Sequence, residues 1–298
     1  MAGPLLVLLF GSFAASTSVI FIKACTIDPV LLASFRLLLA AVLLTPVFAR
    51  ELRRHRIAFN ARLIAPSIVP GLILGVHFIS WTIGARLTAA ANSTLIVNLV
   101  PVVMPFYVYA LLRETINARE MIGTVVAMVG VAVLAVSDFQ FDRTYFVGDS
   151  ISFVSMLFFA LYLVLGRKNN VQRSIWLYLV PLYYTGGLFC FAIALFRVDP
   201  FTARYSVSDV VAVAGLAVAA TIIGHSALNY AMKVFRPQIT SLINLGQFTF
   251  AGVLGYLFFQ ELPDAAFYVA SLLIVAGTAF VIISAGRSKK AKATAPEP

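Results

Sequence analysis

The sequence is dominated by apolar runs of about twenty residues. Short stretches that hold most of the charged residues separate these runs. A helix that crosses a bilayer needs about 20 mostly apolar residues. By that measure the sequence predicts an all-α integral membrane protein with ten transmembrane helices. We place them at Pro4–Ile22, Pro29–Ala49, Leu63–Gly84, Ala89–Leu112, Met121–Val136, Ser150–Leu165, Ile175–Leu195, Asp209–Ala231, Gln238–Phe259 and Phe267–Ala285.

Composition excludes a soluble protein, because 61% of the residues are hydrophobic and only 11% are charged. Soluble domains are about 45–50% apolar and about 25% charged. The net charge of +10 does not indicate a nucleic-acid partner, since the cations lie in short clusters between the apolar runs. With both termini in the cytoplasm, 16 of the 22 lysines and arginines fall on the cytoplasmic side and five on the other. The positive-inside rule therefore predicts cytoplasmic termini.

An internal repeat divides the chain into two halves. Asn98 aligns with Asn244, Glu114 with Glu261 and Gly130 with Gly277, at offsets of 146 or 147. We predict a first five-helix repeat over 1–142, a second over 143–286, and a disordered basic cytoplasmic tail over 287–298. Because each half holds an odd number of helices, the second is expected to enter the membrane inverted, as in many secondary transporters.

Several short motifs carry a resemblance to a known family. They are Phe35-Arg36-Leu37 in the second span, Arg113-Glu114 after the fourth and Gln260-Glu261 after the ninth, with glycine-rich fifth and tenth spans. The chain resembles the EamA-type families of the drug/metabolite transporter superfamily, and most of all bacterial YddG-type amino-acid exporters. The resemblance implies ten helices in two inverted halves, a central cavity, a place in the bacterial inner membrane and export of amino acids.

One position departs from the family pattern. The fourth span keeps a mid-helix proline, Pro101, whereas the aligned position of the ninth span is Gln247. The ninth span is therefore expected to be more polar and less bent. Pro70 and Pro101 are the predicted hinges, because proline removes a helical hydrogen bond and favours a kink.

Polar side chains at membrane depth are costly and usually face the interior of the bundle. His77 and Trp81 lie four residues apart on one helical face, as do His225 and Asn229, and the two pairs are 148 residues apart. Amides can accept hydrogen bonds from an ammonium group and donate them to a carboxylate, and tyrosines such as Tyr107 or Tyr162 can supply apolar walls. We predict a substrate site lined by His77, Trp81, Asn98, Pro101, Tyr162, His225, Asn229, Asn244 and Gln247. Alternatively, Asn98 and Asn244 only bond across neighbouring helices.

Arg36 is the only lysine or arginine inside a predicted span. It could pair with a substrate carboxylate, but we favour a structural role in which it caps carbonyls or reaches toward the membrane surface. Glu114 and Glu261 are also assigned structural roles.

No Asp or Glu lies in the middle of a span, and proton-coupled carriers commonly use a buried carboxylate. The sequence therefore favours a monomeric carrier that moves small zwitterionic metabolites, most of all amino acids, by alternating access without tight proton coupling. The alternatives are proton antiport of other metabolites or drugs through His77 and His225, and a membrane-embedded enzyme, for which no catalytic group can readily be assembled. Apart from substrate and lipid no partner is expected, nor any metal or cofactor, since Cys25 and Cys190 have no metal-ligand spacing.

Overall fold

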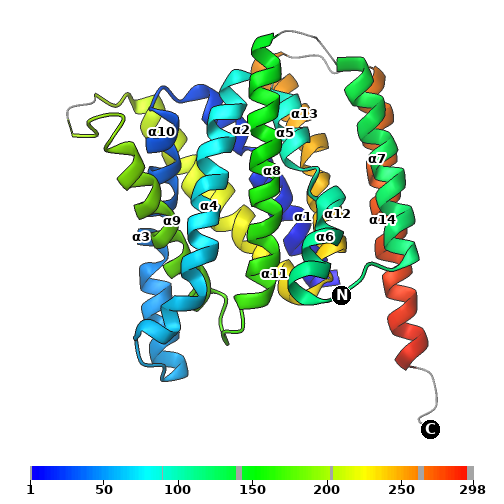
Figure 1. Ribbon diagram of the computed structural model, residues 1–298, viewed down its shortest axis with the longest axis horizontal. Coiled ribbons are helices and arrows are strands. Elements are labelled where there is room, and N and C mark those ends of the chain that lie inside the picture. Colours follow the sequence, from blue (N-terminus) through cyan, green and yellow to red (C-terminus); the bar gives the residue numbers. More distant parts are fainter. Residues whose placement is uncertain (1, 89, 139–142, 202–203, 261–264, 294–298) are drawn as a thin grey trace.

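The computed structural model describes residues 2–88, 90–138, 143–201, 204–260 and 265–293, and these residues are helical apart from their connections (Figure 1). The helices are α1 Ala2–Ser16, α2 Ser18–Ala24, α3 Pro29–His55, α4 Ala61–Leu87, α5 Ala90–Val97, α6 Val100–Leu112, α7 Ala118–Asp138, α8 Arg143–Asn169, α9 Trp176–Ala194, α10 Val207–Gly215, the π-helix η1 Leu216–His225, α11 Ser226–Val234, α12 Pro237–Leu245, α13 Gln247–Phe259 and α14 Ala265–Ala293.

Within the described residues, nine helical stretches are long and apolar enough to cross a membrane. They are Gly3–Ala24, Pro29–His55, Ala61–Leu87, Asn92–Leu112, Tyr145–Asn169, Trp176–Ala194, Val207–Val234, Pro237–Phe258 and Ala265–Ala285. Each coincides with one predicted span. The remaining predicted span, Met121–Val136, lies within α7 and is not among the nine.

Two of the long stretches are interrupted at matching places. Between α5 and α6 the interruption falls at Asn98 and Leu99, and Pro101 lies in the first turn of α6, where its missing N–H is tolerated. Between α12 and α13 it falls at Gly246. The ninth span is thus interrupted as well, although Gln247 replaces the proline. Both α6 and α13 end in a residue with left-handed backbone, Arg113 (φ 56°) and Gln260 (φ 58°), which closes the helix through its N–H.

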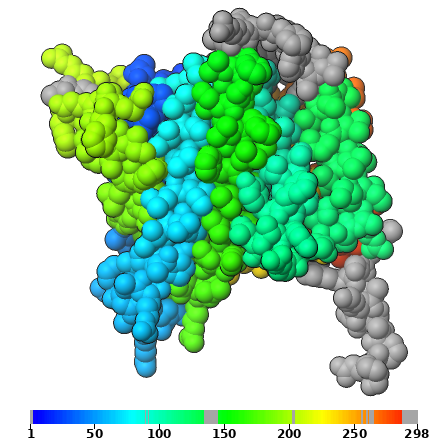
Figure 2. Space-filling view, in the orientation of Figure 1, coloured from blue at the N-terminus to red at the C-terminus, as the bar shows by residue number. Residues whose placement is uncertain are grey.

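The helices pack mainly as neighbouring pairs: α4 with α8 and α9, α3 with α9, α1 with η1, and α7 with α14. Figure 1 shows the α7–α14 pair at one side of the bundle, and Figure 2 shows α8 as a continuous band beside α4 on one face. Gly123 and Gly277 allow the close approach of α7 and α14, because a Cβ built on Gly277 would lie 2.5 Å from the carbonyl oxygen of Gly123. Such contacts between small residues are typical of membrane helix pairs.

Large apolar side chains point outward along the bundle, including Phe106, which is 73% exposed. This is the pattern expected of a surface that faces lipid. Helix α1 begins and α14 ends at the same end of the bundle (Figure 1).

Helix α14 continues to Ala293, into the segment 287–298 that the sequence predicts as a disordered tail. Alanine and lysine are strong helix formers, so that the helix extends into the polar segment. The last five residues of the predicted tail, 294–298, lie outside the described residues.

Candidate functional site

A cluster of stacked rings lies between α4, α8 and η1. We call it the histidine–aromatic cluster, and it consists of His77, Trp81, Phe159, Tyr162 and His225. The His77 ring stacks on Phe159 at 4.6 Å between centroids with 12° between planes, and Trp81 lies parallel to it at 6.1 Å. The four-residue spacing of His77 and Trp81 on α4 places both rings on the face that meets α8.

His77 is held in place by Ser155 of α8. Its Nδ1 lies 2.8 Å from Ser155 Oγ and 3.1 Å from the carbonyl oxygen of the same residue. The hydroxyl of Ser155 also donates to the carbonyl of His77 at 2.9 Å. Trp81 Nε1 donates to Ser93 Oγ on α5 at 3.2 Å, so that the cluster is anchored to three helices.

His225 faces His77 from η1, with the two ring centroids 6.3 Å apart. One turn further along, Asn229 Nδ2 donates to the hydroxyl of Tyr162 and, at 2.8 Å, to the carbonyl of His225. The structure therefore brings together five of the predicted site residues. His77, Trp81, Tyr162, His225 and Asn229 are all buried.

The predicted amides form a second group, which we call the amide cluster: Asn98, Asn244 and Gln247. Gln247 Nε2 donates to Asn244 Oδ1, and Asn244 Nδ2 donates to Asn98 Oδ1 at 2.7 Å. Asn98 Nδ2 then donates to the carbonyl of Thr94 at 2.8 Å. These side chains bond to one another across the two helix interruptions. This is the geometry expected if Asn98 and Asn244 only bond across neighbouring helices. No hydrogen bond among the described residues joins the amide cluster to the histidine–aromatic cluster.

The two predicted hinge prolines differ in their surroundings. Pro101 lies at the interruption between α5 and α6, and its carbonyl accepts a hydrogen bond from Gln238 Nε2 at 3.0 Å. Gln238 also donates to Thr124 Oγ1 at 2.7 Å. Pro70, by contrast, lies inside the uninterrupted helix α4. Pro101 is therefore tied to α12 and α7 and has no hydrogen bond to the histidine–aromatic cluster.

Arg36 is fully buried, and its contacts differ from those expected. Its Nε and one terminal nitrogen donate to Thr221 Oγ1 of η1 at 3.1 and 3.0 Å, and Cζ lies 3.8 Å from the centroid of Phe78. None of its hydrogen bonds reaches a carbonyl among the described residues, and its side chain has no exposed surface.

Sequence reasoning missed Thr221, Ser155 and Ser93. A signal for Thr221 was present, because Thr221, His225 and Asn229 recur every four residues on one stretch of chain. Serines are too common in membrane helices for Ser155 and Ser93 to have been distinguished in the same way.

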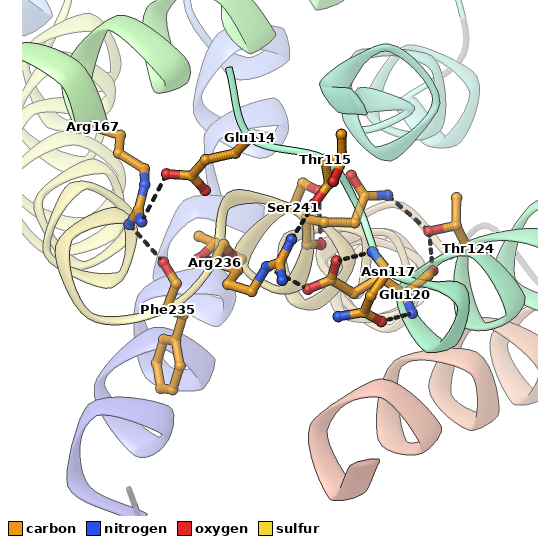
Figure 3. Close-up of polar contacts among 11 residues, drawn as sticks. Glu114, Thr115, Asn117, Glu120, Thr124, Arg167, Phe235, Arg236 and Ser241 are labelled. Atoms are coloured by element: carbon orange, nitrogen blue, oxygen red, sulfur yellow. Dashed lines mark hydrogen bonds and ion pairs between the residues drawn. The ribbon is translucent and has the colours of Figure 1, made fainter. Parts of the chain in front are cut away.

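At the end of the bundle where α6 and α11 terminate, charged residues link several connections (Figure 3). We call this the Arg236 network. Arg236 Nε lies 2.8 Å from Glu120 Oε1, and Arg236 also donates to the carbonyl of Thr115. Glu114 pairs with Arg167 at 3.4 Å, and Arg167 donates to the carbonyl of Phe235 at 3.0 Å. Glu114 is thus part of an interhelical network, while Glu261 lies outside the described residues.

At the opposite end, the Asp209 carboxylate joins α10 to the connection between α2 and α3. Asp209 accepts hydrogen bonds from Thr26 N at 2.7 Å and Ser206 Oγ at 2.7 Å. Cys25 Sγ approaches the same carboxylate at 3.3 Å, and burial, reinforced by this neighbour, raises the pKa of the Cys25 thiol to about 11. Arg86 donates to the carbonyls of Cys25 and Ile27.

The histidine–aromatic cluster has the groups to bind a small solute. It offers flat rings and neutral hydrogen-bonding groups, whereas the described acidic side chains lie at helix ends and in connections. Among the residues that the structure describes, no group of three or more His, Cys, Asp or Glu could hold a metal ion.

Comparison with known proteins gives a family, two curated relatives and a related fold. Two curated relatives are named S-adenosylmethionine uptake transporter: one from Rickettsia prowazekii is 23% identical over 232 residues, and one from Rickettsia bellii is 22% identical over 231. The alignments cover 76% of this chain and 74% and 75% of those proteins. A solved crystal structure, 16% identical, matches with a TM-score of 0.75 over 94% of this chain and 97% of its own, which supports the fold. The family model of the EamA-like transporters matches residues 1–136 and again 146–283. The chain belongs to the EamA-like transporter family, and is a multi-pass membrane protein of the transporter class.

Proposed function

We propose that this transporter carries small zwitterionic metabolites that contain an amino-acid group across the bacterial inner membrane, by alternating access and as a monomer. One observation supports it above the others. The histidine–aromatic cluster is built from helices of both predicted halves and combines flat rings with neutral donors and acceptors, without an acidic side chain among the described residues. Rings and neutral polar groups suit a solute with balanced charge better than a polyanion, which would call for several buried cations.

The proposed halves, 1–142 and 143–286, are inverted copies with five spans each. Four matching features support them: the interruptions at Asn98 and Gly246, the left-handed caps at Arg113 and Gln260, the two separate family matches, and the pairing of α7 with α14. In this proposal α7 is the tenth span. Alternating access would then open in turn the end held by the Arg236 network and the opposite end, where the Asp209 carboxylate joins α10 to the α2–α3 connection.

An amino-acid group is common to the substrates that the two comparisons suggest, namely the amino acids of the resembling exporters and the S-adenosylmethionine of the curated relatives. S-Adenosylmethionine, after which the two curated relatives are named, carries an amino-acid group and an aromatic base. The stacked rings of His77, Phe159 and Trp81 are suited to an aromatic moiety. We therefore place S-adenosylmethionine, whose zwitterionic amino-acid group is accompanied by a sulfonium charge, beside aromatic and medium-sized apolar amino acids as the first candidates.

Transport is proposed to follow the solute gradient. A carrier without ion coupling works in either direction, so that export, which the resemblance implies, and uptake, for which the relatives are named, would depend on where the solute is made. The two buried histidines, 6.3 Å apart, favour proton antiport as the second candidate. Uphill accumulation driven by a pH gradient alone, and lost in His77→Ala, would establish that candidate instead.

Counterflow in proteoliposomes tests the proposal directly. Vesicles loaded with unlabelled solute receive tracer amounts of labelled S-adenosylmethionine, phenylalanine, methionine or leucine. Transient accumulation of at least one labelled solute above that in empty vesicles is the expected result. Failure of all four to accumulate would refute the proposed substrate class, while turnover of a solute into a new compound would indicate a membrane-embedded enzyme.

A further inference from the structure

Arg36 of α3 is a buried cation without a counter-ion. Its side chain has no exposed surface, and one terminal nitrogen, Nη1, has no hydrogen-bond partner. No carboxylate of the described residues lies within 4.0 Å of its guanidinium. The partners that it has are a neutral hydroxyl, Thr221, and the ring face of Phe78.

This arrangement is unfavourable for a closed structure that binds nothing. Charged side chains at membrane depth are expensive and are almost always paired or turned toward a water-filled cavity. A cation–π contact and a neutral hydroxyl compensate only part of the lost hydration of a guanidinium. Because the Arg36 side chain has no exposed surface, an anionic group that enters the bundle would supply the missing partner.

The surroundings of Arg36 are those of a binding site. Thr221 lies in the π-helix η1, and its hydroxyl is fixed by a hydrogen bond to the carbonyl of Leu216 at 2.9 Å. One turn further along, His225 Nδ1 is buried without a partner, and after a second turn the same is true of Asn229 Oδ1. Short π-helical segments are frequent at functional sites. The two unpaired acceptors follow Thr221 at four-residue spacing, His225 in η1 and Asn229 in α11, while the unpaired donor belongs to Arg36 of α3, which bonds to Thr221.

We propose that Arg36 binds the carboxylate of the transported solute, with Nη1 as the donor that completes the contact. This assignment rests on the proposed function and specifies one of its contacts. His225 Nδ1, one turn away, accepts a hydrogen bond from the ammonium group of the same solute. Asn229 Oδ1, in α11 and eight residues beyond Thr221, is placed to accept from a donor at the far end of a longer solute.

The experiment compares each acid with the matching compound that lacks the carboxylate. Labelled S-adenosylmethionine or phenylalanine is transported by wild-type protein in proteoliposomes, and unlabelled inhibitors compete. Decarboxylated S-adenosylmethionine and phenethylamine are expected to inhibit at least about tenfold more weakly than the parent acids. Equal inhibition by an acid and its amine in the wild-type protein would overturn the proposal without any variant.

Variants then assign the discrimination to Arg36. Arg36→Gln is expected to raise KM for the acid at least about tenfold and to bring the acid-to-amine ratio near one. Arg36→Lys, which keeps the charge and has a better chance of folding, is expected to retain part of the ratio. Arg54→Gln, at an exposed arginine of the same helix, is the matched control and should change neither quantity.

The outcomes separate this proposal from the proposed function. Transport of both acids with an unchanged acid-to-amine ratio in a folded Arg36→Lys or Arg36→Gln protein would refute the role of Arg36 and leave the substrate class standing. A lower melting temperature with an unchanged ratio would show that Arg36 is structural. Absence of transport of any zwitterion by wild-type protein would overturn both.

Discussion

Removal of the charge of Glu120 tests whether the Arg236 network holds one end of the bundle closed. The Glu120 side chain is 2% exposed and its Oε1 lies 2.8 Å from Arg236 Nε, while Arg236 is 41% exposed. The other oxygen, Oε2, accepts from Asn117 N at 2.9 Å. Glu120→Gln keeps the shape and an oxygen for Asn117 but removes the ionic attraction, so that the local fold is retained and the contact to the α11–α12 connection is weakened.

The size of the effect follows from the unequal burial of the pair. A hydrogen bond to a charged group contributes about 1.5–3 kcal/mol, and solvent at the exposed Arg236 reduces this to about 1.5 kcal/mol. If the pair is present only when this end is closed, the substitution shifts the equilibrium toward opening by about tenfold, since 1.4 kcal/mol is a factor of ten.

Cysteine labelling measures this shift. Ser241, whose hydroxyl donates to the carbonyl of Gln238, is drawn beside the Arg236 network in Figure 3 and is completely buried. A Ser241→Cys reporter in a Cys25→Ser, Cys190→Ala background is expected to react with a maleimide about tenfold faster when Glu120→Gln is added. Glu51→Gln, which removes the ion pairs with Arg54 and His55 and keeps an oxygen for the hydrogen bond with Ser174, is the control. An unchanged labelling rate in a folded Glu120→Gln protein would refute the reasoning.

Three further predictions concern packing, thiol reactivity and the amide cluster. Gly123→Ala should lower the thermal stability by about 1–3 kcal/mol, because its Cβ would lie 2.7 Å from the carbonyl oxygen of Gly277, whereas Gly3→Ala, with no atom within 4 Å, should leave the melting temperature unchanged. Cys25 should resist alkylation at pH 8 until detergent unfolds the protein, because a pKa of about 11 leaves a thiolate fraction about 100-fold below that of an ordinary thiol; rapid reaction of the folded protein would contradict this. A double-mutant cycle of Asn98→Ala and Asn244→Ala should give a coupling of about 0.6–1.7 kcal/mol in melting experiments, and additive effects would show that their hydrogen bond contributes nothing.

Hydropathy predicted the helices well because the bilayer fixes their length, and nine of the ten predicted spans coincide with apolar helices of the described residues. It could not predict interruptions that depend on tertiary contacts. Gly246 interrupts the ninth span without a proline, and the π-helix η1 lies in a sequence, LAVAATIIGH, with no local sign of irregularity.

The candidate site was predicted in composition but not in arrangement. Residues spaced four apart, such as His77 with Trp81 and His225 with Asn229, do lie on shared faces, since helical geometry alone determines that. Which faces meet depends on how the helices pack, and here the amides turned toward one another and formed a group of their own. The partners of Arg36 were not predicted for the same reason, because Thr221 and Phe78 come from helices that the sequence could not place against α3.

Two of the buried charged residues of the described structure, Arg36 and Glu120, are best understood by comparison. Glu120 is buried at the edge of the bundle, and Arg236 and Asn117 compensate its charge, so that the protein itself supplies what closes this end. Arg36 is buried deeper and has no acidic partner among the described residues. A charge that the protein compensates can stabilise a conformation, whereas a charge that it leaves uncompensated favours whatever ligand supplies the opposite sign. Substitution of Glu120 should therefore change how often one end opens, and substitution of Arg36 should change which solute is carried.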